Sequence, residues 1–467
     1  MAAVQNKSRG WSPETMSPYQ YAIIALCCIA NIADGFDVVS LALAAPVLST
    51  EWAMDPAVLG SLFSAAAVGL TVGAFLVAPQ ADKLGRRPVM LIALGSLAAA
   101  LLLTSIVSNI WQLLVLRFIT GIGLGTLVVC LNTTVAEFAS EKMRNLALAI
   151  LHTGFTVGMI LGSGIATLVL EPIGWRAIFF TAGLLNVATF VLGFMLLGES
   201  PAFLAARKRA RDLVKLDRLG KRMRILNLRE LVISGLSTSA DPSEGKFRML
   251  LSNDLRNRTI LLWLASLTYA IVGYFLMNWK PTILANAGLS PTLAAASGMV
   301  TGLCGALGHL AMGIWGRKVG EGRLTAIFFT ASAVTLVMFG LQPPVPIILL
   351  AIAGLTTFFV VGAYTGLFLV SVLMYPPAAQ NTGLGFVVGF GRIGAIIGPM
   401  IGGFLLSAGF DRMATYFIFS AIAIIPAITM HMANRLAARD LRAAEEDAQA
   451  TANLERTPDA ERSGQAV

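Results

Sequence analysis

Long apolar runs recur along the whole chain and are separated by short polar connections. Each run is close to or above the roughly 20 residues that a helix needs to cross the hydrocarbon core of a bilayer. We therefore expect twelve membrane-spanning helices, at about 20–48, 57–80, 88–108, 111–138, 146–170, 176–197, 259–286, 291–315, 324–341, 346–374, 382–408 and 413–435. This pattern predicts an all-α integral membrane protein with twelve transmembrane helices.

One long hydrophilic segment divides these runs into six and six. The expected organisation is an N-terminal six-helix half at 1–198, a central loop at 199–257, a C-terminal half at 258–435 and a tail at 436–467. The central loop combines basic residues with leucines at helical spacing, which indicates short amphipathic helices on the membrane surface. The tail is rich in alanine and mixed charge, so we expect a frayed helix that becomes disordered.

Internal repetition supports the two halves. The run from Asp82 to Gly85 follows the second span as the run from Arg317 to Gly320 follows the eighth, and glycines recur at matching places in the fifth and eleventh spans. Two six-helix halves related by a parallel repeat are typical of one large class of transporters, in which substrate binds between the halves near the midplane.

The distribution of charged residues predicts how the chain is oriented in the membrane. The chain has 467 residues, of which 56% are hydrophobic and only 13% are charged, and its net charge is +9. The basic residues gather in the connections 82–87, 140–145 and 316–323 and in the central loop, so the positive-inside rule predicts that both termini lie in the cytoplasm. The expected location of this multi-pass protein is the inner (plasma) membrane. The charge is a topology signal, and we expect no nucleic-acid partner.

Two carboxylates interrupt the first apolar run. Asp34 and Asp37 stand three residues apart, on one face of the expected helix. A charge at the centre of a membrane helix costs roughly 2.5–3.5 kcal/mol on insertion scales, so handling of protons or cations is the first candidate role. A carboxyl group removed from water favours its neutral form, and a neighbouring cation opposes this, so such a group can bind and release a proton. A static buried ion pair or a helix-breaking Asp-Gly turn is the structural alternative.

Three motifs resemble a known superfamily. The run from Ala78 to Arg87 resembles the loop signature of the major facilitator superfamily, with Ala78 where glycine is usual. The run from Arg117 to Gly125 resembles its fourth-span signature, and Gly198-Glu199-Ser200-Pro201 resembles the motif that closes the sixth span. The Asp34-Gly35-Phe36-Asp37 element, with Trp279-Lys280-Pro281 and Gly391-Arg392-Ile393-Gly394, is similar to the aromatic acid:proton symporter family.

This resemblance implies a proton-coupled symporter that imports an aromatic carboxylic acid by alternating access. Proton coupling would then involve Asp34, Asp37 and Arg117, with an ion pair between the last two. Arg392, near mid-bilayer, would bind the substrate carboxylate or act in gating, since arginine forms bidentate pairs with carboxylates; packing against polar backbone is the alternative. His309 has a functional counterpart in the family, although a lone membrane histidine can equally hydrogen-bond a neighbouring helix.

The loop after the second span suggests a cytoplasmic gate, formed by Asp82, Gly85, Arg86, Arg87 and Glu137. Asp82 is expected to accept backbone N–H bonds at a helix N-terminus and to pair with arginines across the seam between the halves. Gly85 would allow the tight turn, and Glu137 is the expected partner of the basic residues. The alternative is a solvated basic loop that only sets topology.

Other functions remain open at this point. The alternatives to import are an exporter of drugs or other organic anions, and a membrane sensor that binds such acids. We expect no enzyme, no cofactor and no metal site, because no nucleophile–base constellation or nucleotide-binding glycine loop is apparent and the four cysteines lie inside spans. The expected partners are a small aromatic carboxylate, protons and lipid, bound by a monomer. Aromatic side chains that could line a site for a flat ring, or could simply pack, are Tyr269, Tyr274, Phe275, Trp279 and Tyr364.

Overall fold

The computed structural model describes residues 16–207, 209–225, 228–237, 249–252, 255–343, 345–376 and 379–456. Within these ranges the regular structure is helical, and twelve helices are long and apolar enough to cross a membrane. The predicted fold class is therefore confirmed, and the predicted spans agree with the helices to within a few residues at most ends.

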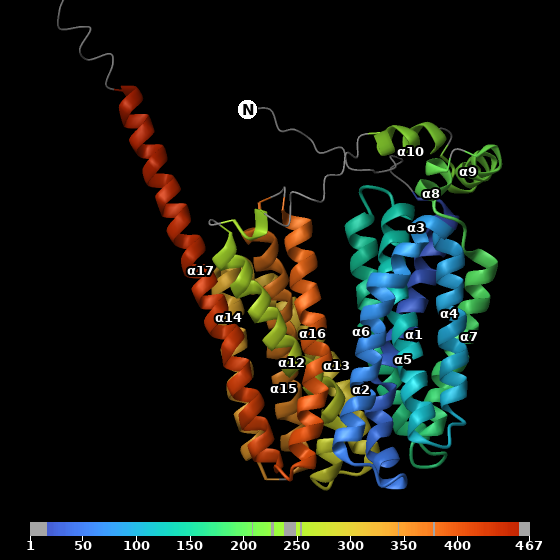
Figure 1. Ribbon diagram of the computed structural model, residues 1–467, viewed down its shortest axis with the longest axis vertical. Coiled ribbons are helices and arrows are strands. Elements are labelled where there is room, and N and C mark those ends of the chain that lie inside the picture. Colours follow the sequence, from blue (N-terminus) through green and yellow to red (C-terminus); the bar gives the residue numbers. More distant parts are fainter. Residues whose placement is uncertain are drawn as a thin grey trace, which may run out of the picture.

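Two bundles of six long helices stand side by side (Figure 1). The first bundle contains α1 (Pro18–Glu51), α2 (Pro56–Val72), α4 (Arg86–Thr104), α5 (Ile110–Phe138), α6 (Arg144–Val169) and α7 (Arg176–Leu196). The second contains α12 (Arg256–Asn286), α13 (Pro291–Val319), α14 (Glu321–Leu341), α15 (Pro346–Met374), α16 (Gln380–Ser407) and α17 (Arg412–Arg456). The short helices α8 (Pro201–Ala206), α9 (Ala210–Met223) and α10 (Leu228–Ser237) lie over one end of the first bundle.

The second span is continuous but irregular. It passes from α2 into a π-helical stretch, η1 (Gly73–Val77), then a 3-10 turn, η2 (Ala78–Gln80), and ends in α3 (Ala81–Leu84). At Gly73 a side chain would meet the carbonyl of Ile122, so α5 approaches the backbone of η1 directly. The change of helical pitch therefore occurs where two backbones are in contact.

Glycines allow the closest helix contacts in both bundles. A Cβ at Gly35 of α1 would meet the backbone of Phe155 in α6, and one at Gly158 would meet the backbone of Ile32. In the second bundle, Gly394 and Gly398 of α16 lie in the same way against the backbone of α12. Small residues let membrane helices approach closely, which favours their packing. The glycines that repeat in the sequence make the same kind of backbone contact in each half, between α6 and α1 and between α16 and α12.

The two bundles converge at the end opposite α8–α10 (Figure 1). Hydrogen bonds between the halves, within the described residues, join Ser407 to Asp55 at 2.9 Å, Ser64 to the carbonyl of Ile396 at 2.7 Å and Thr292 to Glu171. Phe63 and Trp279 add an edge-to-face ring contact at 5.6 Å. The helix ends beneath α8–α10 contribute none of these contacts, so the halves meet mainly at one end.

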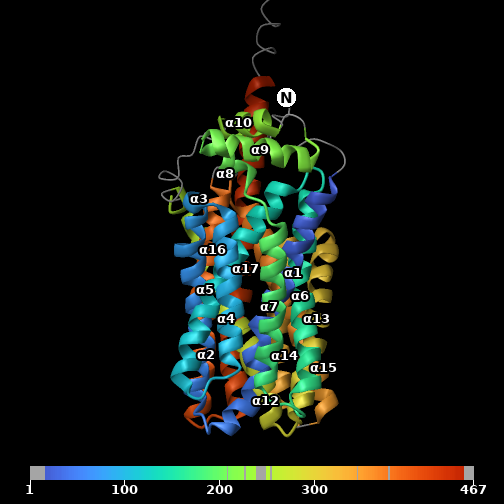
Figure 2. The ribbon, with the colours of Figure 1, turned by 90° about the vertical axis from the view of Figure 1, so that its right-hand side faces the viewer.

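The central loop and the tail extend beyond the helix ends. In α9, Leu216, Leu219 and Met223 are buried while the basic residues are exposed, as the leucine spacing predicts. α17 continues past the predicted end of its span to Arg456 and projects from the bundle (Figure 2). Its alanine, arginine and glutamate residues are strong helix formers, which explains the extension. The rest of the predicted tail, 457–467, lies outside the described residues.

Candidate functional site

α1 carries its two aspartates into the interior of the first bundle. Asp34 and Asp37 are each 1% exposed, and Arg117 of α5 is 2% exposed. An Nη1 of Arg117 donates to Oδ1 of Asp37 at 3.2 Å, and its guanidinium lies 5.0 Å from the ring centroid of Phe179. The predicted pairing of Asp37 with Arg117 is confirmed, while its part in proton coupling stays a prediction.

Several polar atoms of Asp34, Asp37 and Arg117 have no hydrogen-bond partner in the part of the chain that the structure describes. Among the described residues, neither oxygen of Asp34 has a hydrogen-bond partner, and the same holds for Oδ2 of Asp37 and for Nε and Nη2 of Arg117. Buried polar groups are normally hydrogen-bonded, and a buried charge without a partner is costly. A purely structural ion pair would be expected to use these atoms. The ion pair therefore uses only one oxygen of Asp37 and one nitrogen of Arg117 among the described contacts.

A second cluster brings together three tyrosines and an arginine from three helices of the second bundle. Nη1 of Arg392 in α16 donates to the hydroxyl of Tyr274 in α12 at 3.4 Å. The ring of Tyr269 stacks on that of Tyr364 from α15, with centroids 5.1 Å apart, and Tyr269 and Tyr274 both lie on α12. We call Tyr269, Tyr274, Tyr364 and Arg392 the tyrosine–arginine cluster. It combines flat apolar surfaces with a guanidinium that has donors to spare.

Two of the other aromatic candidates pack inside the protein instead. Phe275 stacks on Phe419 with centroids 3.6 Å apart, and the indole of Trp279 donates to the carbonyl of Pro399 at 3.0 Å. For these two side chains the packing interpretation is the one that the structure supports.

Lys280, which the sequence analysis named only as part of the Trp279-Lys280-Pro281 element, is a buried basic residue. It lies on α12, and its Nζ donates to the hydroxyl of Thr357 at 2.9 Å. Lys280 could have been identified as a candidate in the same way as Asp34, because it is also a charged residue in an apolar membrane run. Lys280 and Arg392 are thus two basic residues well inside the spans of the second half, on helices that pack together.

His309 of α13 hydrogen-bonds through Nδ1 to the hydroxyl of Thr365, the residue after Tyr364 on α15. This helix-to-helix bond is what the structural alternative predicts. It also brings the imidazole next to the segment that carries the stacked tyrosine, so the functional role of His309 stays a prediction.

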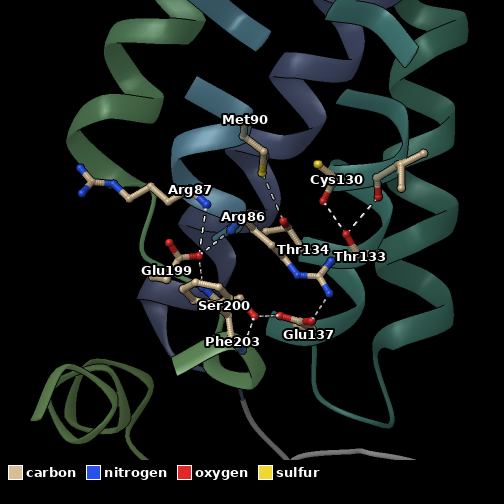
Figure 3. A network of polar contacts seen from close by, with 11 residues as sticks. Arg86, Arg87, Met90, Cys130, Thr133, Thr134, Glu137, Glu199, Ser200 and Phe203 are labelled. Carbon is tan, nitrogen blue, oxygen red and sulfur yellow. Dashed lines mark hydrogen bonds and ion pairs between the residues drawn. The ribbon is translucent and has the colours of Figure 1, made fainter. Parts of the chain in front are cut away.

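Three of the predicted gate residues, Arg86, Arg87 and Glu137, lie near one another at the α8–α10 end (Figure 3). Nη2 of Arg86 lies 2.7 Å from Oε1 of Glu137, and the hydroxyl of Ser200 donates to Oε2 of Glu137 at 2.5 Å. Arg87 donates from Nη2 to the carbonyl of Phe194 at 3.0 Å. The expected partnership of Glu137 with the basic loop is confirmed.

Asp82 does not make the expected backbone bonds; Glu199 makes them. Oε1 of Glu199 accepts the backbone N–H of Arg86 at 2.8 Å and that of Arg87 at 3.2 Å, which caps the N-terminus of α4. Asp82 lies before the turn, inside α3 and exposed, with no hydrogen-bond or ion-pair partner among the described residues. Carboxylates are stabilised at helix N-termini, and the end of α7 brings Glu199 there. The sequence did contain a feature that singled out Glu199, because this residue belongs to the motif that closes the sixth span.

Replacing Gly85 by alanine is expected to lower the stability of this end of the bundle. Gly85 has φ +107°, a conformation that costs other residues about 1–3 kcal/mol, and a Cβ there would collide with Oε2 of Glu199. The matched control is Gly174→Ala, where φ is +100° and a Cβ would meet nothing within 4 Å. Thermal unfolding of the purified variants should show the larger loss for Gly85→Ala. An equal loss of thermal stability in both variants would show that the predicted collision with Glu199 does not affect stability.

The comparisons with known proteins agree with this architecture. The family model described as Major Facilitator Superfamily matches residues 27–372 and 262–458. The chain belongs to the major facilitator superfamily. It is accordingly a multi-pass membrane transporter and not an enzyme.

Similar members of the superfamily carry names of aromatic acid transporters. A gallate transporter of Pseudomonas putida is 34% identical over 84% of this chain and 87% of its own length. A 4-hydroxybenzoate transporter of Pseudomonas aeruginosa is 28% identical, with 89% and 93% covered. The resemblance drawn from the Asp34–Asp37 element is confirmed by these relatives.

Solved structures show the same fold. A D-xylose–proton symporter matches with a TM-score of 0.68 at 16% identity, covering 88% of this chain and 97% of that one. A bacterial homologue of the lysosomal transporter Spinster matches with a TM-score of 0.72 at 15% identity, covering 90% and 97%. At these identities the likeness concerns the fold alone.

Proposed function

We propose that this transporter imports an aromatic carboxylate together with protons across the inner membrane, by alternating access between the two halves. The observation that carries the proposal is the tyrosine–arginine cluster, in which Arg392 donates to the hydroxyl of Tyr274 and the rings of Tyr269 and Tyr364 stack on each other. Guanidinium groups bind carboxylates with two parallel hydrogen bonds, and aromatic faces accept flat rings. The named substrates of the relatives, gallate and 4-hydroxybenzoate, have both features.

Proton coupling is assigned to Asp34, Asp37 and Arg117. A buried carboxylic acid that lacks a partner is least costly when it is neutral, and Arg117 competes with the proton for Asp37. A change of the surroundings during rocking of the halves can therefore drive uptake on one side and release on the other. Arg392 and His309 are assigned to substrate binding or gating in the other half.

The conformation is proposed to face the cytoplasm. Arg86, Arg87 and the basic α9 lie at the α8–α10 end, and the positive-inside rule assigns that end and both termini to the cytoplasm. The contacts between the halves lie at the opposite, outer end. Asp82 would then find its partner across the seam only when the inner end closes. The division into 1–198, 199–257, 258–435 and 436–467 is retained in this proposal.

Uptake of labelled acids by cells that express the protein tests this function. Benzoate, 4-hydroxybenzoate, gallate, protocatechuate and gentisate form the panel, each with and without a protonophore. We expect at least one acid to accumulate above its external concentration and the protonophore to abolish that accumulation. Lower accumulation together with raised resistance would instead indicate an exporter. Binding without flux would indicate a sensor.

A further inference from the structure

A pocket of about 640 Å³ lies between α9 and the ends of α4 and α7, away from both clusters described above. Five basic side chains line it: Arg87, Arg207, Lys215, Arg218 and Arg222. Lys215, Arg218 and Arg222 stand at positions i, i+3 and i+7 of α9, on one helical face. The amphipathic helix thus places a row of exposed cations along one side of the pocket.

The acids in this pocket leave the positive charge in excess. Glu199 already accepts backbone N–H groups at the N-terminus of α4, and Asp212 pairs with Lys215 at 3.7 Å. Arg222 lies over the ring of Tyr19 at 5.7 Å, and within the described residues Arg218 has no hydrogen-bond or ion-pair partner. At least two guanidinium groups therefore keep donors free for an anion.

Apolar side chains border the same pocket on the outside of the bundle. Phe194 and Met195, in the last turn of α7, are 61% and 74% exposed, and both line the pocket. In a membrane-spanning helix such side chains face lipid. The cationic row consequently begins where the apolar surface of α7 ends, which is the level of lipid headgroups.

We propose that this pocket binds the phosphate group of an anionic phospholipid. Arg218 and Arg222 hold the phosphate oxygens, since guanidinium forks match that geometry, and the phenol of Tyr19 lies at the polar–apolar boundary. The acyl chains lie along Phe194 and Met195. A soluble phosphate ester would use the same cations but would gain nothing from the apolar border, so a lipid is the occupant.

The bound lipid would connect α9 to the gate network. Arg87 and Glu199 line the pocket and also belong to the contacts at the start of α4. Occupancy would therefore hold the central loop against α4 and α7 next to Glu137. This proposal is independent of which substrate is transported.

The test uses the full-length purified protein in nanodiscs of phosphatidylcholine, with or without phosphatidylglycerol, and measures thermal stability and lipid retention by native mass spectrometry. The variant is Arg218→Gln/Arg222→Gln. The matched control, Arg211→Gln/Lys221→Gln, removes the same charge from α9 at residues that do not line the pocket. Inorganic phosphate and glycerol 1-phosphate form the soluble arms.

We expect phosphatidylglycerol to stabilise the wild type and the control. The pocket variant is expected to bind this lipid at least about tenfold more weakly than the wild type. Equal weakening in variant and control, or equal effects of both lipids, would overturn the proposal. Equal protection by the soluble phosphates would overturn the assignment to a lipid. If the double variant is not recovered from the membrane, the single variants Arg218→Gln and Arg222→Gln carry the same comparison, each expected to show a smaller loss.

Discussion

Replacing Asp37 by asparagine is expected to abolish substrate accumulation driven by the proton gradient, while exchange of substrate across the membrane continues. Asparagine has nearly the same shape and still offers an acceptor to Nη1 of Arg117, but it cannot take up a proton. The measurement is the ratio of internal to external labelled acid in vesicles with an imposed proton gradient. We expect this ratio to fall to the value found without the gradient.

Stability has to be followed beside transport, because the substitution leaves the buried Arg117 without its counter-charge. Breaking a buried ion pair typically costs about 3–5 kcal/mol, although the retained hydrogen bond reduces this. The amount of protein in the membrane is therefore measured for each variant. Asp37→Glu restores the titratable group and should recover part of the accumulation.

Glu51→Gln is the matched control for Asp37→Asn. Glu51 also lies on α1 and also pairs with an arginine, Arg176 at 2.9 Å, but both side chains are 41% exposed. Exposed pairs contribute only about 0–1 kcal/mol, so accumulation and protein level should stay near wild type. Accumulation by Asp37→Asn that matches Glu51→Gln would contradict the coupling role.

Replacing Arg392 by lysine is expected to raise the KM for the aromatic acid by about 10- to 100-fold. Lysine keeps the positive charge but loses the planar fork, and a hydrogen bond to a charged group contributes about 1.5–3 kcal/mol. Initial uptake rates over a range of substrate concentrations measure this effect. At saturating substrate the gradient-driven accumulation should persist, which separates binding from coupling.

Two further variants complete this experiment. Tyr274→Phe removes the hydroxyl that accepts from Arg392 and should raise KM by only about 2- to 10-fold, the effect of about 0.5–1.5 kcal/mol. Arg323→Lys changes an exposed arginine of α14 in the same half and should leave KM unchanged. A KM for Arg392→Lys equal to that of Arg323→Lys would exclude direct binding of the carboxylate by Arg392.

The spans and the Asp37–Arg117 pair were predictable for related reasons. A helix in lipid must satisfy its own backbone, so length and hydropathy alone identify it. A charge in such a helix is too costly to lack a role, and superfamily packing makes Arg117 of the fourth span the natural partner of Asp37. Identification of the spans depends only on the individual helix and its solvent, while the choice of Arg117 as partner also uses the packing that the superfamily resemblance implies.

The partners of Glu199 and the grouping of Tyr269 with Tyr364 were not predictable in this way. Glu199 caps α4 only because the end of α7 arrives beside Gly85, and Asp82, the more obvious candidate, lies on the exposed side of the turn. The two tyrosines are far apart in sequence and stack because α12 and α15 lie together. Lys280 was visible as a charge, but its contact with Thr357 depends on the same packing.

The amino-acid sequence by itself determined that this chain crosses the membrane twelve times, that its halves repeat, and that Asp34 and Asp37 are buried at an energetic cost. The spans and the cost of the aspartates follow from hydropathy, length and the desolvation of a charge, which are local to each helix, and the repeat follows from motifs that recur at matching places. Only the tertiary structure decided which carboxylate caps α4, which hydroxyl accepts a hydrogen bond from Arg392, and at which end the halves touch. These depend on side chains from distant helices meeting, and close packing alone selects those neighbours.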